Sequence, residues 1–403
     1  MRNKSLYSFV LILMISVSAP VWARKHRIVL PTAFDQPSCV VNEDNSVSFC
    51  YCGAEKRVKV LGDFQYAGKD SSRYSDMRTR TIKMKRGVDG CMHATTKPLV
   101  PETYTYCFRV NGKLKTDLHN NDTAWQMTHK WNIVSVGGTP QADLYLQPPL
   151  KGQLIQTKWY DRAEGINRRV NIYLPAAYEH LSNGQFQMSN IKFPVLYLLH
   201  GINGYEGSWT ERGRAIQIIE NLIASDSIAP LIVVMPDCNT GVHEDRPSHH
   251  TLWNNVWHYP RLCRDHSFEL ALEDLMQHID TTYSVSDQRY IAGFSSGARI
   301  AANIVNRYPD KFLAVGLFSP VVYKEQMPKT NIPPFYIYMG KSDMFINNGR
   351  RFHKRLIKSG IDHFYMENDG GHTWLNWRLY LSDYLQKVSQ NCLQSPQTPA
   401  CGQ

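Results

Sequence analysis

The sequence predicts an α/β fold with a mostly parallel sheet and helices on both faces, preceded by a small all-β immunoglobulin-like sandwich. Short β-prone segments fill the first part of the chain, and strands alternate with helices in the second. A proline- and glycine-rich cluster at residues 147–152 separates the two patterns. With 403 residues available, we expect the sandwich at residues 24–150, the α/β domain at 151–390 and a tail at 391–403.

The first pattern consists of short β-prone segments with turn signals between them. Gly62-Asp63 and Asn111-Gly112 are two of these signals. Several short strands at such spacing are typical of a β-sandwich. The expected strands are residues 47–51, 57–61, 79–84 and 104–110.

The second pattern has strands of continuous apolar character, as expected for a sheet covered on both faces. Phe268, Leu272 and Ile279 share one stripe of an expected helix, which indicates core packing. Ligands bind such folds at the carboxyl ends of the strands. The expected strands are residues 170–174, 195–199, 231–235, 290–293, 314–318 and 335–339, and the expected helices are 215–224, 268–283, 298–308 and 349–358.

The strongest functional signal is the pentapeptide Gly293-Phe294-Ser295-Ser296-Gly297, which lies between an expected strand and an expected helix. In this setting the G-x-S-x-G pattern forms a tight turn that holds the serine hydroxyl clear of the backbone. A serine hydroxyl needs a histidine base, and the histidine needs an acid to orient it. We therefore predict that Ser295 is a catalytic nucleophile.

Candidates for the acid and the base follow downstream. Asp343 comes just after the expected strand 335–339, and His372 lies in a Gly-Gly-His-Thr-Trp segment. The chain order Ser, Asp, His is that of the α/β-hydrolase fold and differs from the chymotrypsin and subtilisin orders. The predicted triad needs neither a metal nor a cofactor.

The loop His200-Gly201-Ile202 follows an apolar strand and predicts an oxyanion hole. In α/β-hydrolases, the loop at this place donates one backbone N–H and the residue after the nucleophile donates the other. The expected donors are the backbone amides of Ile202 and Ser296. The alternative is that His200-Gly201 only ends a strand.

From about residue 158 to 385, the chain resembles the esterase D-type branch of the α/β-hydrolases. This branch includes carbohydrate esterase family 1 feruloyl and acetylxylan esterases and the enterochelin esterases. The sequence departs from the usual pattern at Ser296, often methionine, and at Ala298, often glycine, but neither change removes a catalytic group. The matching stretches are residues 168–175, 197–201 with Trp209 following, 231–237, the Ser295 segment, and 371–374 with Trp377-Arg378.

Three stretches of the first region, residues 62–64, 104–106 and 110–113, resemble an early-set immunoglobulin-like module that precedes some of these esterases. That module is related to glycogen-binding modules, so the resemblance implies glycan binding with Trp125 and Trp131 as stacking residues. The alternative is a structural role, with both tryptophans packed inside the protein.

The segment Cys238–His266 is rich in histidine and aromatic residues. Its histidine spacing matches no closed metal site, and we predict no metal. We expect a loop over the active site whose Trp253 and Trp257 help to form the acyl or sugar pocket, with Trp209 and Trp374 as further walls. The alternatives are a surface segment bracketed by two cysteines, and tryptophans that serve only as packing.

The first residues predict export. Arg2 and Lys4 precede an apolar run at residues 6–17, and Val21-Trp22-Ala23 resembles a cleavage site. We therefore predict that residues 1–23 are a secretory signal peptide, which implies a periplasmic or secreted protein. The alternative is an uncleaved N-terminal anchor. No later stretch is long and apolar enough to cross a bilayer.

The net charge bears on the partners expected for this chain, and the cysteine content bears on its disulfides. The net charge of +10 comes without a long Lys/Arg block or a nucleic-acid motif, so a nucleic-acid partner is not expected. Nine cysteines in an exported chain can form disulfides, and their odd number leaves at least one unpaired within the chain. Their connectivity stays open.

Together these features predict an exported serine esterase that acts on ester-decorated plant cell-wall polysaccharide or oligosaccharide. Feruloyl ester hydrolysis is the first expectation and acetylxylan ester hydrolysis the second. A siderophore esterase of the enterochelin type and a non-catalytic glycan-binding protein are the alternatives.

Overall fold

The computed structural model describes residues 37–67, 79–126, 128–146, 151–178, 191–202, 204–239, 267–322 and 332–394. From Pro37 onward, the described residues belong to a single compact unit. The predicted signal peptide and residues 240–266, with Trp253 and Trp257, lie outside the described residues. The predicted domain boundaries therefore remain predictions.

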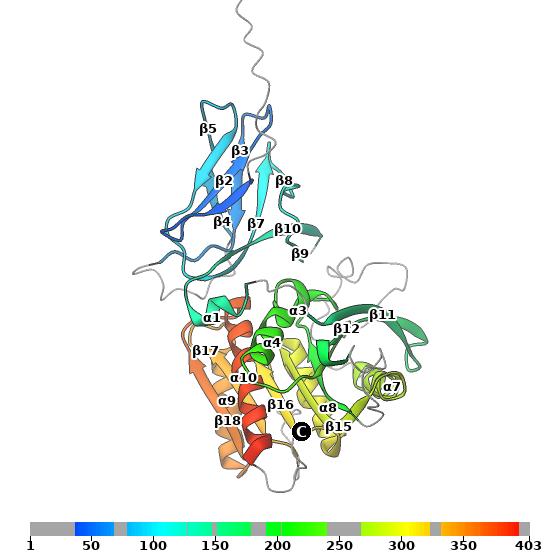
Figure 1. The fold of residues 1–403 in the computed structure, drawn as a ribbon. Coiled ribbons are helices and arrows are strands. Elements are labelled where there is room, and N and C mark those ends of the chain that lie inside the picture. Colours follow the sequence, from blue (N-terminus) through cyan, green and yellow to red (C-terminus); the bar gives the residue numbers. More distant parts are fainter. Residues whose placement is uncertain are drawn as a thin grey trace, which may run out of the picture. The chain divides into compact units, whose positions relative to one another are not determined.

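Two antiparallel sheets form the first part of the described chain, drawn from blue to cyan in Figure 1. One has the strand order β1-β2-β6-β5, and the other has the order β4-β3-β7-β10-β9 with β8 paired to β7. Side chains from both sheets share one core, in which the rings of Phe49 and Tyr106 lie 4.8 Å apart. This arrangement confirms the predicted all-β sandwich. The strands are β1 (Cys39–Val41), β2 (Val47–Tyr51), β3 (Val58–Gly62), β4 (Arg80–Lys83), β5 (Lys85–Arg86), β6 (Met92–Thr95), β7 (Glu102–Val110), β8 (Lys113–Lys115), β9 (Thr123–Gln126) and β10 (His129–Val136).

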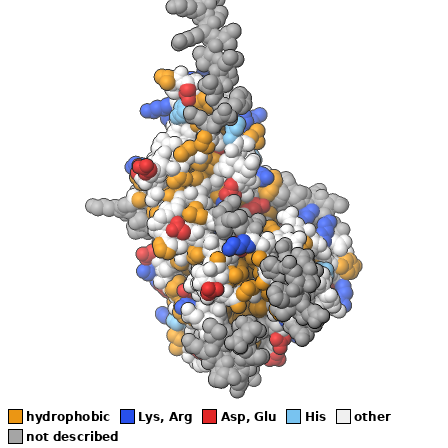
Figure 2. Space-filling model, in the orientation of Figure 1, with side chains coloured by type: hydrophobic (Ala, Val, Ile, Leu, Met, Phe, Trp, Pro, Cys, Tyr) orange, Lys and Arg blue, Asp and Glu red, His pale blue; other side chains and the backbone are white. Residues whose placement is uncertain are grey.

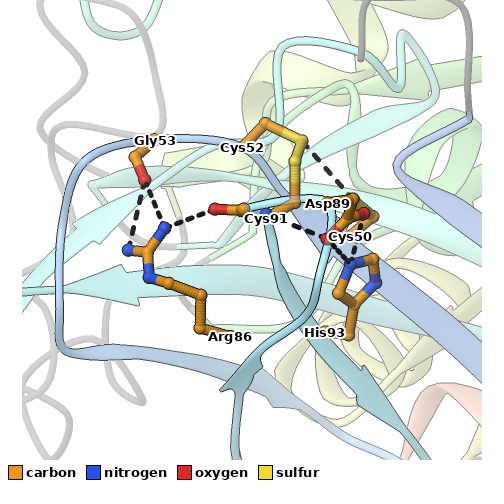
Figure 3. The surroundings of a disulfide bond; sticks show 8 residues. Cys50, Cys52, Gly53, Arg86, Asp89, Cys91 and His93 are labelled. Carbon is orange, nitrogen blue, oxygen red and sulfur yellow. Dashed lines mark hydrogen bonds and ion pairs between the residues drawn. A yellow bond between two sulfur atoms is a disulfide. The ribbon is translucent and has the colours of Figure 1, made fainter. Parts of the chain in front are cut away.

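A disulfide joins Cys52, just after β2, to Cys91, just before β6 (Figure 3). The free thiol of Cys50 lies 3.7 Å from the Cys52 sulfur. Beside the disulfide, the guanidinium of Arg86 donates a hydrogen bond to the backbone carbonyl of Glu55 (2.7 Å). The disulfide thus links two paired strands of one sheet, a connection that the sequence left open.

An eight-stranded sheet forms the second part, with the order β11-β12-β14-β13-β15-β16-β17-β18. The first three strands pair antiparallel, and the strands from β14 to β18 pair parallel. The predicted mostly parallel sheet is therefore confirmed. The strands are β11 (Gln153–Asp161), β12 (Ile166–Leu174), β13 (Phe193–Leu199), β14 (Ile232–Pro236), β15 (Val285–Phe294), β16 (Ala314–Phe318), β17 (Phe335–Gly340) and β18 (His363–Asn368).

Helices cover both faces of this sheet (Figure 1). On β13, Val195 and Tyr197 belong to one core and Leu196 and Leu198 to the other, because successive strand residues point to opposite faces. The first core includes α7, α8 and α9, and the second includes α4 and α10. The helices are α1 (Pro140–Asp143), α3 (Ser208–Glu211), α4 (Ala215–Ala224), α7 (Ser267–Thr282), α8 (Ser296–Arg307), α9 (Ile346–Lys358) and α10 (Trp374–Gln394), with a 3-10 turn η3 (Pro309–Lys311).

The Lys and Arg side chains on the face shown in Figure 2 lie in separate spots. None of the described helices has the length and apolar character needed to cross a bilayer.

Candidate active site

Ser295 lies at the turn between β15 and α8 with an unusual backbone conformation. Its φ of 55° and ψ of −118° are rare for a residue other than glycine, and such strain persists only where the surroundings impose it. Its backbone N–H donates to the Phe318 carbonyl on the neighbouring strand β16 (2.9 Å). The turn therefore has the geometry of the predicted nucleophile elbow.

The two glycines of the pentapeptide are needed because backbone atoms approach them closely. A Cβ on Gly297 would lie 2.4 Å from the His200 carbonyl oxygen, and a Cβ on Gly293 would lie 2.7 Å from the Gly297 carbonyl carbon. No real Cβ sits that close to backbone. The first turn of α8 therefore packs directly against the end of β13.

His372 and Asp343 are brought together at the carboxyl end of the sheet. His372 Nδ1 lies 3.0 Å from Asp343 Oδ2, and both side chains are buried. The second oxygen of Asp343 accepts a hydrogen bond from the Phe345 N–H (2.8 Å), which fixes the carboxylate. The loop that carries His372 is held by Asn376, whose Oδ1 accepts from the Gly371 N–H (2.9 Å). With Nδ1 engaged, Nε2 is the ring nitrogen available for proton transfer.

The loop with Ile202 is held in place by His200, which is also buried. His200 Nε2 accepts from the Cys238 N–H (3.0 Å), while Nδ1 lies 2.8 Å from the Gly201 carbonyl oxygen. The same Nε2 lies 3.4 Å from Asp237 Oδ1; although burial opposes the shift, Cys238 and Asp237 raise the pKa of His200 above its usual value. Ser296 begins α8, where the backbone N–H groups of the first helical turn lack intrahelical partners. The assignment of the Ile202 and Ser296 amides as oxyanion-hole donors remains a prediction.

Ser295 and His372 line one cavity of about 380 Å³, a size within the range of ligand pockets. Ile202 and Trp374 line it as well. Trp209 is only 1% exposed, donates its indole N–H to the Leu199 carbonyl (3.0 Å) and is absent from the described lining. The structure therefore places Trp374 at the cavity and Trp209 in the packing behind it.

The cavity has a second wall that belongs to the antiparallel sheets. Trp125 and Trp131, named from the sequence as stacking candidates, belong to it. Asp63 also lines it, although the sequence indicated only a turn there, and Arg212 joins it from the α/β part. A local pattern could not identify these two side chains, because they meet only after the two sheet systems pack together.

Arg378 on α10 connects the two parts of the chain next to this cavity. Its buried guanidinium donates to the Glu102 carboxylate (3.0 Å), the Thr103 carbonyl (2.9 Å) and the Arg212 carbonyl (2.6 Å). Burial raises the pKa of Glu102 to about 7, although Arg378 opposes the shift. The sequence named Arg378 only as part of a family motif.

Strand β9, which carries Trp125, is bonded to α3 and to the residues that follow it in the α/β part of the chain. The Trp125 N–H donates to Glu211 Oε2 on α3 (2.7 Å), and Arg214 forms an ion pair with Asp122. The second cavity wall is therefore anchored to the segment that follows the Ile202 loop.

Metal ligands in the described part of the chain cluster at Cys50, Cys52 and Cys91. Two of these sulfurs form the disulfide, so this cluster does not offer a thiolate site in the oxidised protein. It belongs to the antiparallel sheets, and neither it nor the disulfide is part of the cavity lining.

A model of the Esterase family, described as "Putative esterase", matches residues 163–388. An endo-1,4-beta-xylanase/feruloyl esterase of Xylanibacter ruminicola is 26% identical over 311 residues, which cover 76% of this chain and 41% of that protein. An acetyl esterase of Caldicellulosiruptor saccharolyticus is 33% identical over 72 residues, 17% of this chain and 27% of that protein. The chain thus spans less than half the length of either relative.

Solved structures share the fold. The enterobactin esterase of Shigella flexneri has a TM-score of 0.59 at 16% identity, covering 86% of this chain and 94% of that one. A ferulic acid esterase of Anaeromyces mucronatus has a TM-score of 0.50 at 20% identity, covering 67% of this chain and 97% of that one. At such identities the likeness concerns the fold alone.

Proposed function

The chain belongs to the Esterase family, and on that premise we propose that it is an exported serine esterase that removes feruloyl groups from plant cell-wall polysaccharide. The observation that carries the proposal is the strained Ser295 turn on the same cavity as His372, whose imidazole is paired with Asp343. Export rests on the predicted signal peptide at residues 1–23.

In the proposed mechanism, the Ser295 hydroxyl attacks the ester carbonyl while His372 Nε2 takes its proton. Asp343 keeps the other ring nitrogen protonated and stabilises the imidazolium. The backbone N–H groups of Ile202 and Ser296 hold the negative oxygen of the tetrahedral intermediate. His372 then gives its proton to the leaving alcohol, and water repeats the sequence on the acyl-enzyme to release the acid.

An aromatic acyl group is favoured by the cavity wall near Ser295. The Phe294 and Trp377 rings stack 4.0 Å apart, and Trp374 meets Phe294 edge-on at 4.7 Å. Flat aromatic surfaces of this kind suit a planar phenolic acid. The similarity to the Xylanibacter ruminicola enzyme, named as a xylanase and feruloyl esterase, supports the same choice.

The second candidate is hydrolysis of acetyl esters on xylan. It is favoured by the short match to an acetyl esterase. An acetyl group would leave most of the aromatic wall without contact, so the two candidates differ in how they use Phe294, Trp374 and Trp377.

The test is hydrolysis of methyl ferulate, acetylated xylan and enterobactin by the chain without residues 1–23, with Ser295→Ala as the matched variant. We expect turnover of methyl ferulate that disappears in the variant. Turnover of acetylated xylan alone would select the second candidate, and equal turnover by both proteins would refute the role of Ser295. Hydrolysis of enterobactin alone would move the function to siderophore esters.

A further inference from the structure

The cavity at Ser295 has two chemically different walls. The α/β part contributes aromatic side chains, including Phe294, Trp374 and Trp377. The antiparallel sheets contribute hydrogen-bonding side chains and two tryptophans, Trp125 and Trp131. Six residues of this second wall are together named the polar wall: Asp63, Gln65, Thr105, Trp125 and Gln126, with Arg212 from the segment after α3.

Two buried polar atoms of the polar wall have no hydrogen-bond partner among the described residues. They are Gln126 Oε1, an acceptor, and Arg212 Nε, a donor. Buried polar atoms are as a rule hydrogen bonded. One acceptor and one donor on the same cavity match a ligand whose groups both donate and accept, and hydroxyl groups do both.

The charges on this wall are balanced. Thr105 fixes the Asp63 carboxylate with its backbone N–H (2.6 Å) and its hydroxyl (2.9 Å). Arg212 lies 3.5 Å from the same carboxylate, and its cation faces the Trp374 ring at 5.7 Å. One anion beside one cation leaves no excess charge for an anionic ligand, so the pair favours a neutral polyhydroxylated group.

Of the two tryptophans that the antiparallel sheets contribute to the cavity, Trp125 is the better placed to contact a ligand. Trp131 packs with Leu61 and Cys107 in a small core of the antiparallel sheets. Trp125 is only half-buried, and its backbone is fixed by Glu211. An indole ring offers an apolar face for the C–H side of a sugar ring.

We propose that the polar wall binds the alcohol half of the ester as one neutral sugar residue, which stacks on Trp125 and hydrogen bonds to Gln126, Arg212 and Asp63. This inference rests on the proposed function of Ser295. The acyl half then lies against Phe294 and Trp377, so the ester carbon falls between the two walls at Ser295. The antiparallel sheets would in this way be part of the active site.

The test compares two esters of the same acid, methyl ferulate and 5-O-feruloyl-L-arabinofuranose. Their acyl halves are identical, and only the second has a sugar for the polar wall. We expect Trp125→Ala and Gln126→Ala to lower kcat/KM for the sugar ester by about 10-fold, mainly through KM, and to leave methyl ferulate within about twofold of the wild type. Trp125→Phe should restore most of the sugar preference.

The matched control is Lys130→Ala. Lys130 is the exposed cross-strand partner of Trp125, and it is not part of the described cavity lining. We expect Lys130→Ala to leave kcat/KM unchanged for both esters. If the Trp125 and Gln126 variants melt at the wild-type temperature, their effect on the sugar ester reflects binding and not loss of structure.

Other results would overturn either the sugar subsite or the esterase function. Equal losses on both esters, unchanged sugar-ester kinetics, or a wild type that does not prefer the sugar ester would overturn the sugar subsite while leaving the esterase function intact. If only acetyl esters are hydrolysed, the same comparison applies to p-nitrophenyl acetate and acetylated xylobiose. A wild type that hydrolyses none of the four would refute the proposed function itself.

Discussion

Arg378→Met tests the connection between the antiparallel sheets and the α/β sheet. At pH 5 Glu102 is protonated in the folded wild type and in the folded variant, and the two unfolded chains titrate alike, so the variant loses only the hydrogen bonds to the Thr103 and Arg212 carbonyls. At about 1–1.5 kcal/mol each, the free energy of unfolding falls by about 2–3 kcal/mol.

The free energy of unfolding that Arg378→Met loses relative to the wild type should grow as the pH rises. The folded pKa of Glu102, about 7, lies above its unfolded value of 4.5, so wild-type stability falls as the pH rises from 4.5 through 7. Without Arg378 the folded pKa rises further, and each additional pH unit above 7 costs the variant about 1.4 kcal/mol more than the wild type. The total at pH 8 is about 3–5 kcal/mol, as expected when one partner of a buried ion pair is removed.

Urea unfolding at pH 5 and pH 8 measures both values. Lys387→Met is the matched control, because Lys387 lies on the same helix in a partly exposed pair with Asp383 and should cost less than about 0.5 kcal/mol. A loss below about 1 kcal/mol for Arg378→Met at pH 8, or a larger loss at pH 5 than at pH 8, would refute this reasoning.

Three further predictions concern the turn, the triad and the disulfide. Gly297→Ala should lower the free energy of unfolding by about 1–3 kcal/mol and reduce kcat, because the added methyl group meets the His200 carbonyl. Thermal melts and kinetics measure the two effects. An unchanged kcat would contradict the close packing at Gly297. Asp343→Asn should lower kcat by about 10³–10⁴-fold with a nearly unchanged KM, and a loss under 10-fold would exclude it as the orienting acid. Replacing Cys52 and Cys91 by serine should cost about 3–4 kcal/mol in urea unfolding, and equal stability with and without reductant would contradict a stabilising disulfide.

The sequence predicted the second sheet well because its strands are short, apolar and separated by clear helices. Helix α4 matches its expected bounds, Ala215–Ala224. Strand β18 was missed because its residues are all partly buried and mix polar with apolar types. Strand β11, at the edge of the sheet, was missed for a similar reason: most of its residues are exposed or partly buried.

Helix α10 was missed although its signal is present. Trp377, Tyr380, Leu381, Tyr384 and Val388 recur at helical spacing and are all buried. The helix supplies Trp377 and Arg378 to the cavity and the connection beside it.

The candidate site was predictable where its residues sit in local motifs. Ser295, Asp343 and His372 each follow a strand, so their convergence at one sheet edge follows from the topology. The polar wall was not predictable, because Asp63 and Arg212 are 149 residues apart and meet only through tertiary packing. Trp209 and Trp374 look alike in sequence and are both buried, and only the cavity lining, which includes Trp374, distinguishes the two rings.

The central claim is that Ser295 is the nucleophile, and covalent labelling tests it most directly. The protein would be treated with diethyl p-nitrophenyl phosphate, which transfers a diethylphosphoryl group to activated serines, and analysed by peptide mass spectrometry. We expect one equivalent of label on Ser295, with loss of esterase activity in step with labelling and no label in Ser295→Ala. Label on Ser296 or elsewhere, or full activity in a protein fully labelled at Ser295, would contradict the claim.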